Sequence, residues 1–269
     1  MDYMNLHQSA HGGREFGFAA SRLRKSRHVI AGHWQDLEIQ REFAAWARVA
    51  RGWAESQTCR VARFGDNMRN VAVTEGDKVE AQIQLGWRVD GYGLDDLYRA
   101  MDEAQDQVPQ IVEACLDEYN VAAELQKGAS QHHALVESAR IEAGIRHFLV
   151  QGNFSAFTTT FENLGNLPQL PGLAVQRLMK EGYGFGAEGD WKTAALLYIV
   201  KVIGLNQEGG ASFIEDYTYH FGEEAACLGA HMLEVCPSIT TEQPISVSSP
   251  GHRRQSRPCA FAFWCQSSG

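Results

Sequence analysis

The sequence lacks the features that mark several classes of protein. No run of residues reaches the ~18 consecutive apolar positions that a membrane-spanning helix requires. The N-terminal segment MDYMNLHQSAHGGREFGF shows no basic stretch followed by an apolar one, the pattern of a secretory signal peptide. No block of lysine or arginine is present, and the formal net charge is −9. We therefore expect neither nucleic acid nor an anionic membrane as a partner.

Cysteine motifs are also missing. The six cysteines include no C-x-x-C pair and no spacing typical of a zinc site: they are Cys59, Cys115, Cys227, Cys236, Cys259 and Cys265. In a chain of 269 residues, scattered buried thiols are more typical than a disulfide framework. The composition, 44% hydrophobic and 21% charged, is that of a globular protein. Together these features predict a cytoplasmic globular protein.

Short β-like runs alternate with helical patterns along most of the chain. Strands are expected at 28–34, 59–65 and 156–161, and helices at 37–56, 94–119, 132–152, 172–182 and from Trp191, with Asp190 as N-cap. This alternation predicts an α/β fold with a mostly parallel sheet. After residue 210 two strand-like runs, 211–221 and 227–236, suggest a second, more β-rich domain.

Two glycine-rich segments invite a ligand-binding interpretation. Residues 184–189, GFGAEG, match G-x-G-x-x-G ahead of a helix, but a dinucleotide site requires a strand before the glycines. The preceding residues follow a helical pattern, so we predict a tight helix-to-helix connection. Residues 10–17 fit either an anion-binding turn at His11 and Arg14 or a plain loop. Residues 63–87 fit either a solvated loop or the lining of a polar cleft.

Charged and imidazole groups also fall within apolar patterns. If 227–236 is a strand, His231 shares a face with Leu233 and Val235, while Glu215 shares one with Phe213. Such groups must be paired, coordinated or neutral when buried. Hydrogen-bonded core residues are the simpler interpretation. A Glu188/Glu215/His231 metal site is the second, although these separations match no local ligand motif.

Several long segments together resemble the L-arabinose isomerase family, from the N-terminus to about residue 244. They are MNLHQSAHGGREFGF, GHWQD, RFGDNMRNVAVTEGDKVEAQI, LPGLAVQRLMKEGYGFGAEGDWKTAALL, SFIEDYTYHF and LGAHMLEVCPSI. The resemblance implies a fucose/arabinose isomerase-like α/β fold with a parallel-sheet central domain. The expected parts are a remnant of an N-terminal α/β domain (1–58), the central domain (59–210), the start of a C-terminal β-rich domain (211–247) and a non-family tail (248–269).

The resemblance also implies a site. Glu188 and Glu215 match two catalytic, metal-binding carboxylates, and His231 matches a metal-ligating histidine. Met68 and Phe161 match residues that line the sugar pocket, while His11 matches a histidine that reaches the site of a neighbouring subunit. The family binds one divalent metal per site, usually Mn²⁺, and forms trimer-based hexamers. The implied activity is the conversion of L-arabinose to L-ribulose in arabinose catabolism.

This chemistry suits those residue types. Aldose–ketose isomerisation moves a proton from C2 to C1 through an enediol, which two carboxylates can manage while a divalent cation polarises the carbonyl. Two glutamates and one histidine suit Mn²⁺, which favours oxygen-rich ligation. Glu188 then lies at the start of a rigid helix, where the neighbouring glycines let a substrate approach closely.

Both ends of the chain depart from the family pattern. The start matches an internal family segment, and the family's second metal-binding histidine lies further downstream, so the fourth ligand has no counterpart here and His252 is not assigned that role. Residues 248–260, shifted by one nucleotide, can read HPLGIGGKADPVR, which is family-like. We interpret the tail as a reading-frame shift near 243–248, which the nucleotide sequence tests. Two alternatives stay open: an inactive truncated fragment that retains only oligomer contacts or weak metal and sugar binding, and a related sugar isomerase of the same fold.

Overall fold

A computed structural model describes residues 10–240, 246–248 and 263–264. The chain separates into two compact units, Met1–Ala47 and Arg48–Gly269, and each is described by itself. Among the described residues, no helix is both long enough and apolar enough to cross a membrane. The domain boundaries expected at residues 58 and 210 stay predictions.

The first unit contains helix α2 (Ala10–Arg22) and the beginning of α3 (Leu37–Ser56). The prediction of a helix at 37–56 is confirmed. Residues 10–17 are helical, so both a turn and a loop were wrong interpretations there. The predicted strand at 28–34 is also wrong: His28 instead forms an ion pair with Glu42 at 2.5 Å and stacks on Trp46. A strand needs a neighbour for its backbone hydrogen bonds, and the described part of this unit contains none.

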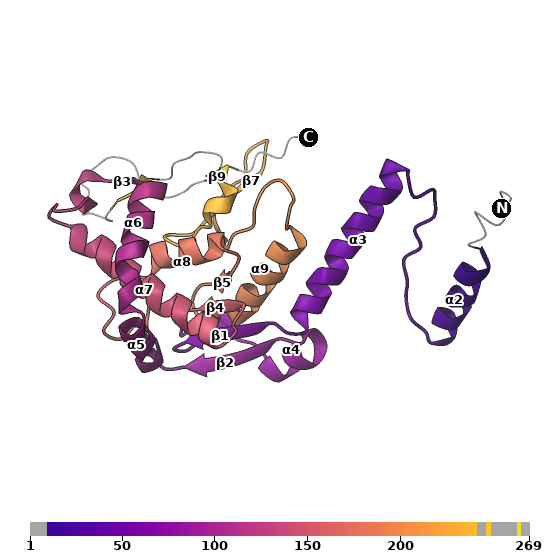
Figure 1. Ribbon diagram of the computed structural model, residues 1–269, viewed down its shortest axis with the longest axis horizontal. Coiled ribbons are helices and arrows are strands. Elements are labelled where there is room, and N and C mark those ends of the chain that lie inside the picture. Colours follow the sequence, from indigo (N-terminus) through magenta and orange to yellow (C-terminus); the bar gives the residue numbers. More distant parts are fainter. Residues whose placement is uncertain (1–9, 241–245, 249–262, 265–269) are drawn as a thin grey trace. The chain divides into compact units, whose positions relative to one another are not determined.

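The second unit is built on a parallel sheet with strand order β2-β1-β4-β5 (Figure 1). Its strands are β1 (Arg60–Phe64), β2 (Arg88–Tyr92), β4 (Ala156–Thr158) and β5 (Gly184–Gly186). Val61 lies opposite both Val89 and Ala156. The predicted α/β fold with a parallel sheet is confirmed, with strands at 59–65 and 156–161 in place and the second one shorter than expected.

Helices cover both faces of this sheet. Successive side chains of a strand point to opposite faces, so Ala62 packs with α5 (Leu94–Glu103), α7 (His132–Gln151) and α8 (Gly172–Lys180), whereas Val61 packs with α9 (Trp191–Ile203). Figure 1 shows the sheet lying between these two layers. The core on the first face includes Phe64, Leu97, Met101, Ile141, Ile145, Phe157, Leu178 and Phe185, all buried.

One predicted helix is broken. Residues 94–119 form α5, a 3-10 turn η2 (Gln105–Gln107) and α6 (Val108–Glu118) instead of one helix. Pro109 explains the break, because its ring would collide with the carbonyl of Gln105 in a continuous helix and it has no N–H to donate. A second core lies under α6 and α7 beside β3 (Asn120–Val121), which pairs with β8 (Ser246–Val247), and η3 (Ala123–Leu125).

The first two glycines of GFGAEG, Gly184 and Gly186, lie in strand β5, contrary to the predicted helix-to-helix connection. A Cβ atom at Gly184 would lie 2.1 Å from the Ala194 carbonyl oxygen, within the backbone of α9. Glycine therefore lets α9 pack directly against β5, and the first glycines of the motif serve packing. Asp190 is confirmed as the N-cap of α9, since its carboxylate accepts from the N–H groups of Lys192 and Thr193.

A small antiparallel sheet follows, with strand order β6-β7-β9. Its strands are β6 (Glu215–His220), β7 (Ala226–Ala230) and β9 (Phe263–Trp264). The predicted second strand ends at Ala230, so His231 lies just after it, before η4 (Pro237–Ile239). A register shift between Asp216 and Thr218 interrupts the alternation assumed for β6. His252 and most of the segment interpreted as out of frame lie outside the described residues.

The buried cysteines allow a simple check of this core. Burial raises the pKa of Cys59 to about 12 and that of Cys115 to about 11, so both thiols stay protonated at pH 8. Cys227 is only partly buried. In a Cys259→Ser/Cys265→Ser chain at pH 8, we expect Ellman's reagent to label Cys227 well before Cys59 or Cys115. Equal labelling rates, followed by peptide mass spectrometry, would contradict the placement of Cys59 in the core.

Candidate active site at the carboxyl end of the parallel sheet

Three of the predicted site residues lie just beyond the carboxyl ends of three neighbouring strands. Met68 follows β1, Phe161 follows β4 and Glu188 follows β5. The chain leaves β1 toward β2 on one side, whereas β4 lies on the other side, so the loops after β1 and β4 diverge. This topological switch point is where doubly wound sheets bind their ligands.

These loops are tied to one another by hydrogen bonds. The Met68 N–H donates to the Glu188 carbonyl at 2.9 Å, and the Gly189 N–H donates to the Thr159 carbonyl at 3.0 Å. The Arg69 N–H donates to the Glu162 carboxylate at 3.1 Å. Residues far apart in sequence are thus held side by side at the sheet edge.

Glu188 adopts an unusual backbone conformation. Its φ angle is +60°, in the left-handed region that non-glycine residues avoid. The side chain is partly buried, and burial, followed by repulsion from Glu215, raises the pKa of Glu188 despite the opposing effect of His231. Glu188, Glu215 and His231 are therefore close enough to interact electrostatically. A strained residue of this kind is typical of functional sites.

Glu215 and His231 come from β6 and from the turn after β7. The imidazole Nε2 lies 4.0 Å from the Glu215 carboxylate. The His231 ring packs edge-on against Phe213, with 4.9 Å between ring centroids. The antiparallel pairing of β6 and β7 places Glu215 opposite Ala230, next to His231.

Glu234 is a further member of this cluster that the sequence did not single out. Its carboxylate lies 2.7 Å from His231 Nδ1, an ion pair outside the angular range of a hydrogen bond. Burial lowers the pKa of His231, but Glu234, with Glu215 and Glu188, more than offsets this, so the net shift is upward. Glu234 lies three residues after His231, in a segment that was predicted to be a strand. Side chains three positions apart on a strand point to opposite faces, so the sequence gave no signal of this contact.

The predicted residues differ in how far the structure brings them together. His231 lies 4.0 Å from Glu215, and both interact electrostatically with Glu188. Met68 is hydrogen-bonded to the Glu188 backbone. Phe161 belongs to the adjoining loop and is 56% exposed, free to contact a ligand. His11 lies on α2 in the first unit, so its role beside a neighbouring subunit stays a prediction.

The donor types at this edge suit a divalent cation better than their positions do. Two carboxylates and one imidazole are an appropriate set for Mn²⁺. Among the residues that the structure describes, however, no three His, Cys, Asp or Glu side chains are arranged to hold a metal ion. For bonds of about 2.1 Å to an octahedral ion, ligand atoms at right angles lie about 3 Å apart and opposite ones about 4.2 Å apart. The 4.0 Å between His231 Nε2 and the Glu215 carboxylate therefore suits opposite positions only.

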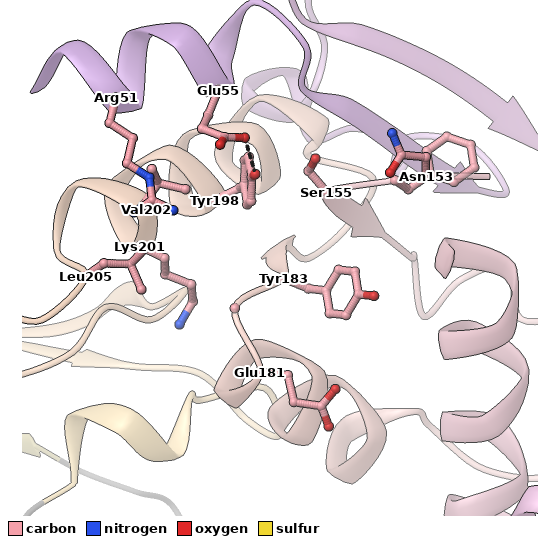
Figure 2. A pocket seen from close by; sticks show the side chains of 12 residues that line it. Arg51, Glu55, Asn153, Ser155, Glu181, Tyr183, Tyr198, Lys201, Val202 and Leu205 are labelled. Atoms are coloured by element: carbon pink, nitrogen blue, oxygen red, sulfur yellow. Dashed lines mark hydrogen bonds between the residues drawn. The ribbon is translucent and has the colours of Figure 1, made fainter. Parts of the chain in front are cut away.

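A separate cleft of about 500 Å³ opens at the amino ends of β4 and β5, the opposite ends from the candidate site (Figure 2). It lies between the end of α3, the end of α9 and the segments that precede β4 and β5. Two of its charged groups have partners: the Tyr198 hydroxyl donates to Glu55 at 2.9 Å, and Lys201 donates to the Ala211 carbonyl at 2.8 Å. None of the predicted site residues lines it.

A doubly wound sheet with an acidic cluster and an imidazole beyond its carboxyl ends defines the class of ligand-binding α/β domains. Family models narrow this class. The N-terminal, central and C-terminal domain models of L-arabinose isomerase match residues 1–58, 60–206 and 210–267. The chain belongs to the L-arabinose isomerase family.

Curated relatives agree. The L-arabinose isomerase of Herpetosiphon aurantiacus is 58% identical over 246 residues, and that of Koribacter versatilis is 57% identical over 245. Each alignment covers 91% of this chain and 49% of the relative, so the chain spans about half the length of the curated relatives it matches. The range matched by the C-terminal model includes most of the segment interpreted as out of frame, whose reading frame stays a question for the nucleotide sequence.

Proposed function

We propose that the chain carries the carboxylate half of an active site that converts L-arabinose to L-ribulose. The observation that carries this proposal is the electrostatic interaction of Glu188, at the carboxyl end of the sheet, with Glu215 and His231. Glu188 and Glu215 lie 27 positions apart in the sequence. In addition to burial, Glu215 raises the pKa of Glu188, and His231 lowers it. Membership of the isomerase family supplies the reaction.

In the proposed reaction, one carboxylate removes the proton from C2 of the open-chain sugar and returns a proton to C1. The other assists the transfer of the hydroxyl proton from the oxygen on C2 to the oxygen on C1. Glu188 suits the first task, because a general base works best when its pKa is near the working pH. The pKa of Glu188 is raised in that direction. Glu215, whose side chain is 40% exposed, suits exchange with the sugar hydroxyls. Met68 and Phe161 would line the sugar pocket from the loops after β1 and β4.

Metal binding and assembly belong to the same proposal. Glu188, Glu215 and His231 would hold Mn²⁺, which when bound polarises the sugar carbonyl. In the described residues these three groups are not arranged around an ion, and the roles proposed above belong to the protein side chains alone. We also propose that the chain forms a homo-oligomer built from trimers, in which His11 reaches a neighbouring site. Its proposed location is the cytoplasm.

The direct test is turnover by the chain as it stands. We expect L-ribulose to form from L-arabinose in the presence of Mn²⁺, detected by a ketose-specific colour reaction or by NMR. The control is the same chain treated with a chelator. Absence of turnover together with micromolar Mn²⁺ binding, about −8 kcal/mol, would support the inactive-fragment alternative instead. Faster turnover of galactose or fucose would favour a related sugar isomerase.

A further inference from the structure

The conformation of the Glu188–Gly189 segment requires an explanation. Both residues have left-handed φ angles, +60° and +81°. A glutamate pays a steric cost there, because its Cβ atom crowds the following carbonyl. Such a residue stays in place only when its surroundings hold it there.

The Asn67 side chain lies against this segment. It is 8% exposed. Its amide nitrogen donates to the Gly189 carbonyl at 3.1 Å and to the Thr74 carbonyl, and its amide oxygen accepts from Arg63. Two carbonyls at one end and a guanidinium at the other fix the orientation of the amide group. One side chain thus joins the loop after β1, the turn η1 (Ala72–Thr74) and the loop after β5.

The backbone contacts are equally close. The Met68 N–H donates to the Glu188 carbonyl. A Cβ atom at Gly189 would lie 2.6 Å from Asn67 Cα and 2.8 Å from the Asp66 carbonyl oxygen. The peptide between Glu188 and Gly189 is therefore held by the Met68 N–H and the Thr159 carbonyl. The next peptide, between Gly189 and Asp190, is held by the Asn67 amide.

We propose that Asn67 is a positioning residue that keeps Glu188 in the left-handed conformation and so directs its carboxylate toward Glu215 and His231. The consequence for catalysis rests on the proposed function, whereas the effect on Glu188 conformation does not. Asn67 itself need not touch the substrate. Its contribution is the hydrogen bond to the Gly189 carbonyl, which fixes the peptide that follows the Glu188–Gly189 peptide.

The test is Asn67→Asp in the full chain. Aspartate has the same shape and can still accept from Arg63, but it cannot donate to the Gly189 and Thr74 carbonyls. We expect the HN–Hα coupling and ¹³C shifts of Glu188, measured by NMR, to lose their left-handed signature. Exchange of the Met68 amide should become about tenfold faster as the adjoining hydrogen bonds are lost. The matched control, Asn206→Asp, changes an exposed asparagine that also has a positive φ.

A Glu188 signature that stays left-handed in Asn67→Asp would overturn the proposal and leave Asn67 with a structural role only. If Asn67→Asp does not fold, Asn67→Ala removes the same donors without adding charge, and failure of both to fold also overturns it. If the wild-type chain has turnover, kcat should fall in the variant while KM changes little. A wild-type chain without turnover counts against the proposed function alone, because the NMR signature still decides the role of Asn67.

Discussion

Replacing Glu188 by glutamine is expected to lower L-arabinose turnover by about 10²- to 10⁴-fold, the usual contribution of one general acid–base group. Glutamine keeps the shape of the side chain and its hydrogen-bonding capacity but cannot accept a proton at neutral pH. The expected loss lies in kcat, measured as ketose formation. Glu223→Gln, in the exposed turn between β6 and β7, is the matched control and should retain wild-type turnover.

The same substitution should not destabilise the fold. Burial and Glu215 raise the pKa of Glu188, so the folded state binds its proton more tightly than the unfolded state does. Protonated Glu188 therefore increases the free energy of unfolding at pH values below its unfolded pKa of ~4.5. This stabilisation is lost as the pH rises through the higher pKa that Glu188 has in the folded state. At pH 7, Glu188→Gln should melt at the wild-type temperature or above it. Lost turnover together with a lower melting temperature would point to a structural role for Glu188.

Replacing Glu142 by glutamine is expected to have the largest effect on stability, about 3 kcal/mol in the free energy of unfolding. Burial raises the pKa of Glu142 against the lowering effect of Arg177 and Arg146. Unlike Glu188, however, Glu142 is bonded to both arginines, so its loss leaves charges unpaired, and we expect that cost to dominate. The Glu142 side chain on α7 is 1% exposed and accepts from Arg177 of α8 and from Arg146, each at 2.7 Å. Arg177 is itself 8% exposed. Loss of the carboxylate leaves two neighbouring guanidinium groups, one of them buried, without their shared counterion.

Urea unfolding followed by circular dichroism measures this effect. The control is Glu113→Gln, which breaks the ion pair between Glu113 and Lys127. These two side chains are 54% and 62% exposed, respectively. An exposed pair of this kind contributes at most about 1 kcal/mol. Equal losses in the two variants would contradict the view that the Glu142 network joins α7 to α8.

Local pattern was a good guide to several elements. The apolar spacing of residues 37–56 and 132–152 predicted α3 and α7, and Asp190 before an apolar run predicted the N-cap of α9. Pro109 was visible in the sequence, but the apolar periodicity on both sides concealed the break between α5 and α6. These features depend on residues within a few positions of one another, which is why the sequence alone suffices for them.

The pattern misled where the answer depended on distant neighbours. Residues 28–34 have strand-like composition, but a strand forms only beside another strand. Gly184 and Gly186 were predicted to connect two helices, but they form β5, against which α9 packs closely. His231 was assigned to a strand that ends one residue earlier, at Ala230.

For the site, the sequence by itself determined the chemical types: two glutamates and a histidine in long segments that resemble one family, with Met68 and Phe161 beside them. Only the tertiary structure decided that Glu188 lies near Glu215 and His231, that Glu234 pairs with His231, and that Asn67 bonds to Gly189 across 122 positions of sequence. The reason is physical. Side-chain chemistry belongs to each residue alone, whereas distance, burial and the resulting pKa shifts arise only when the packed sheet brings separate loops to one edge.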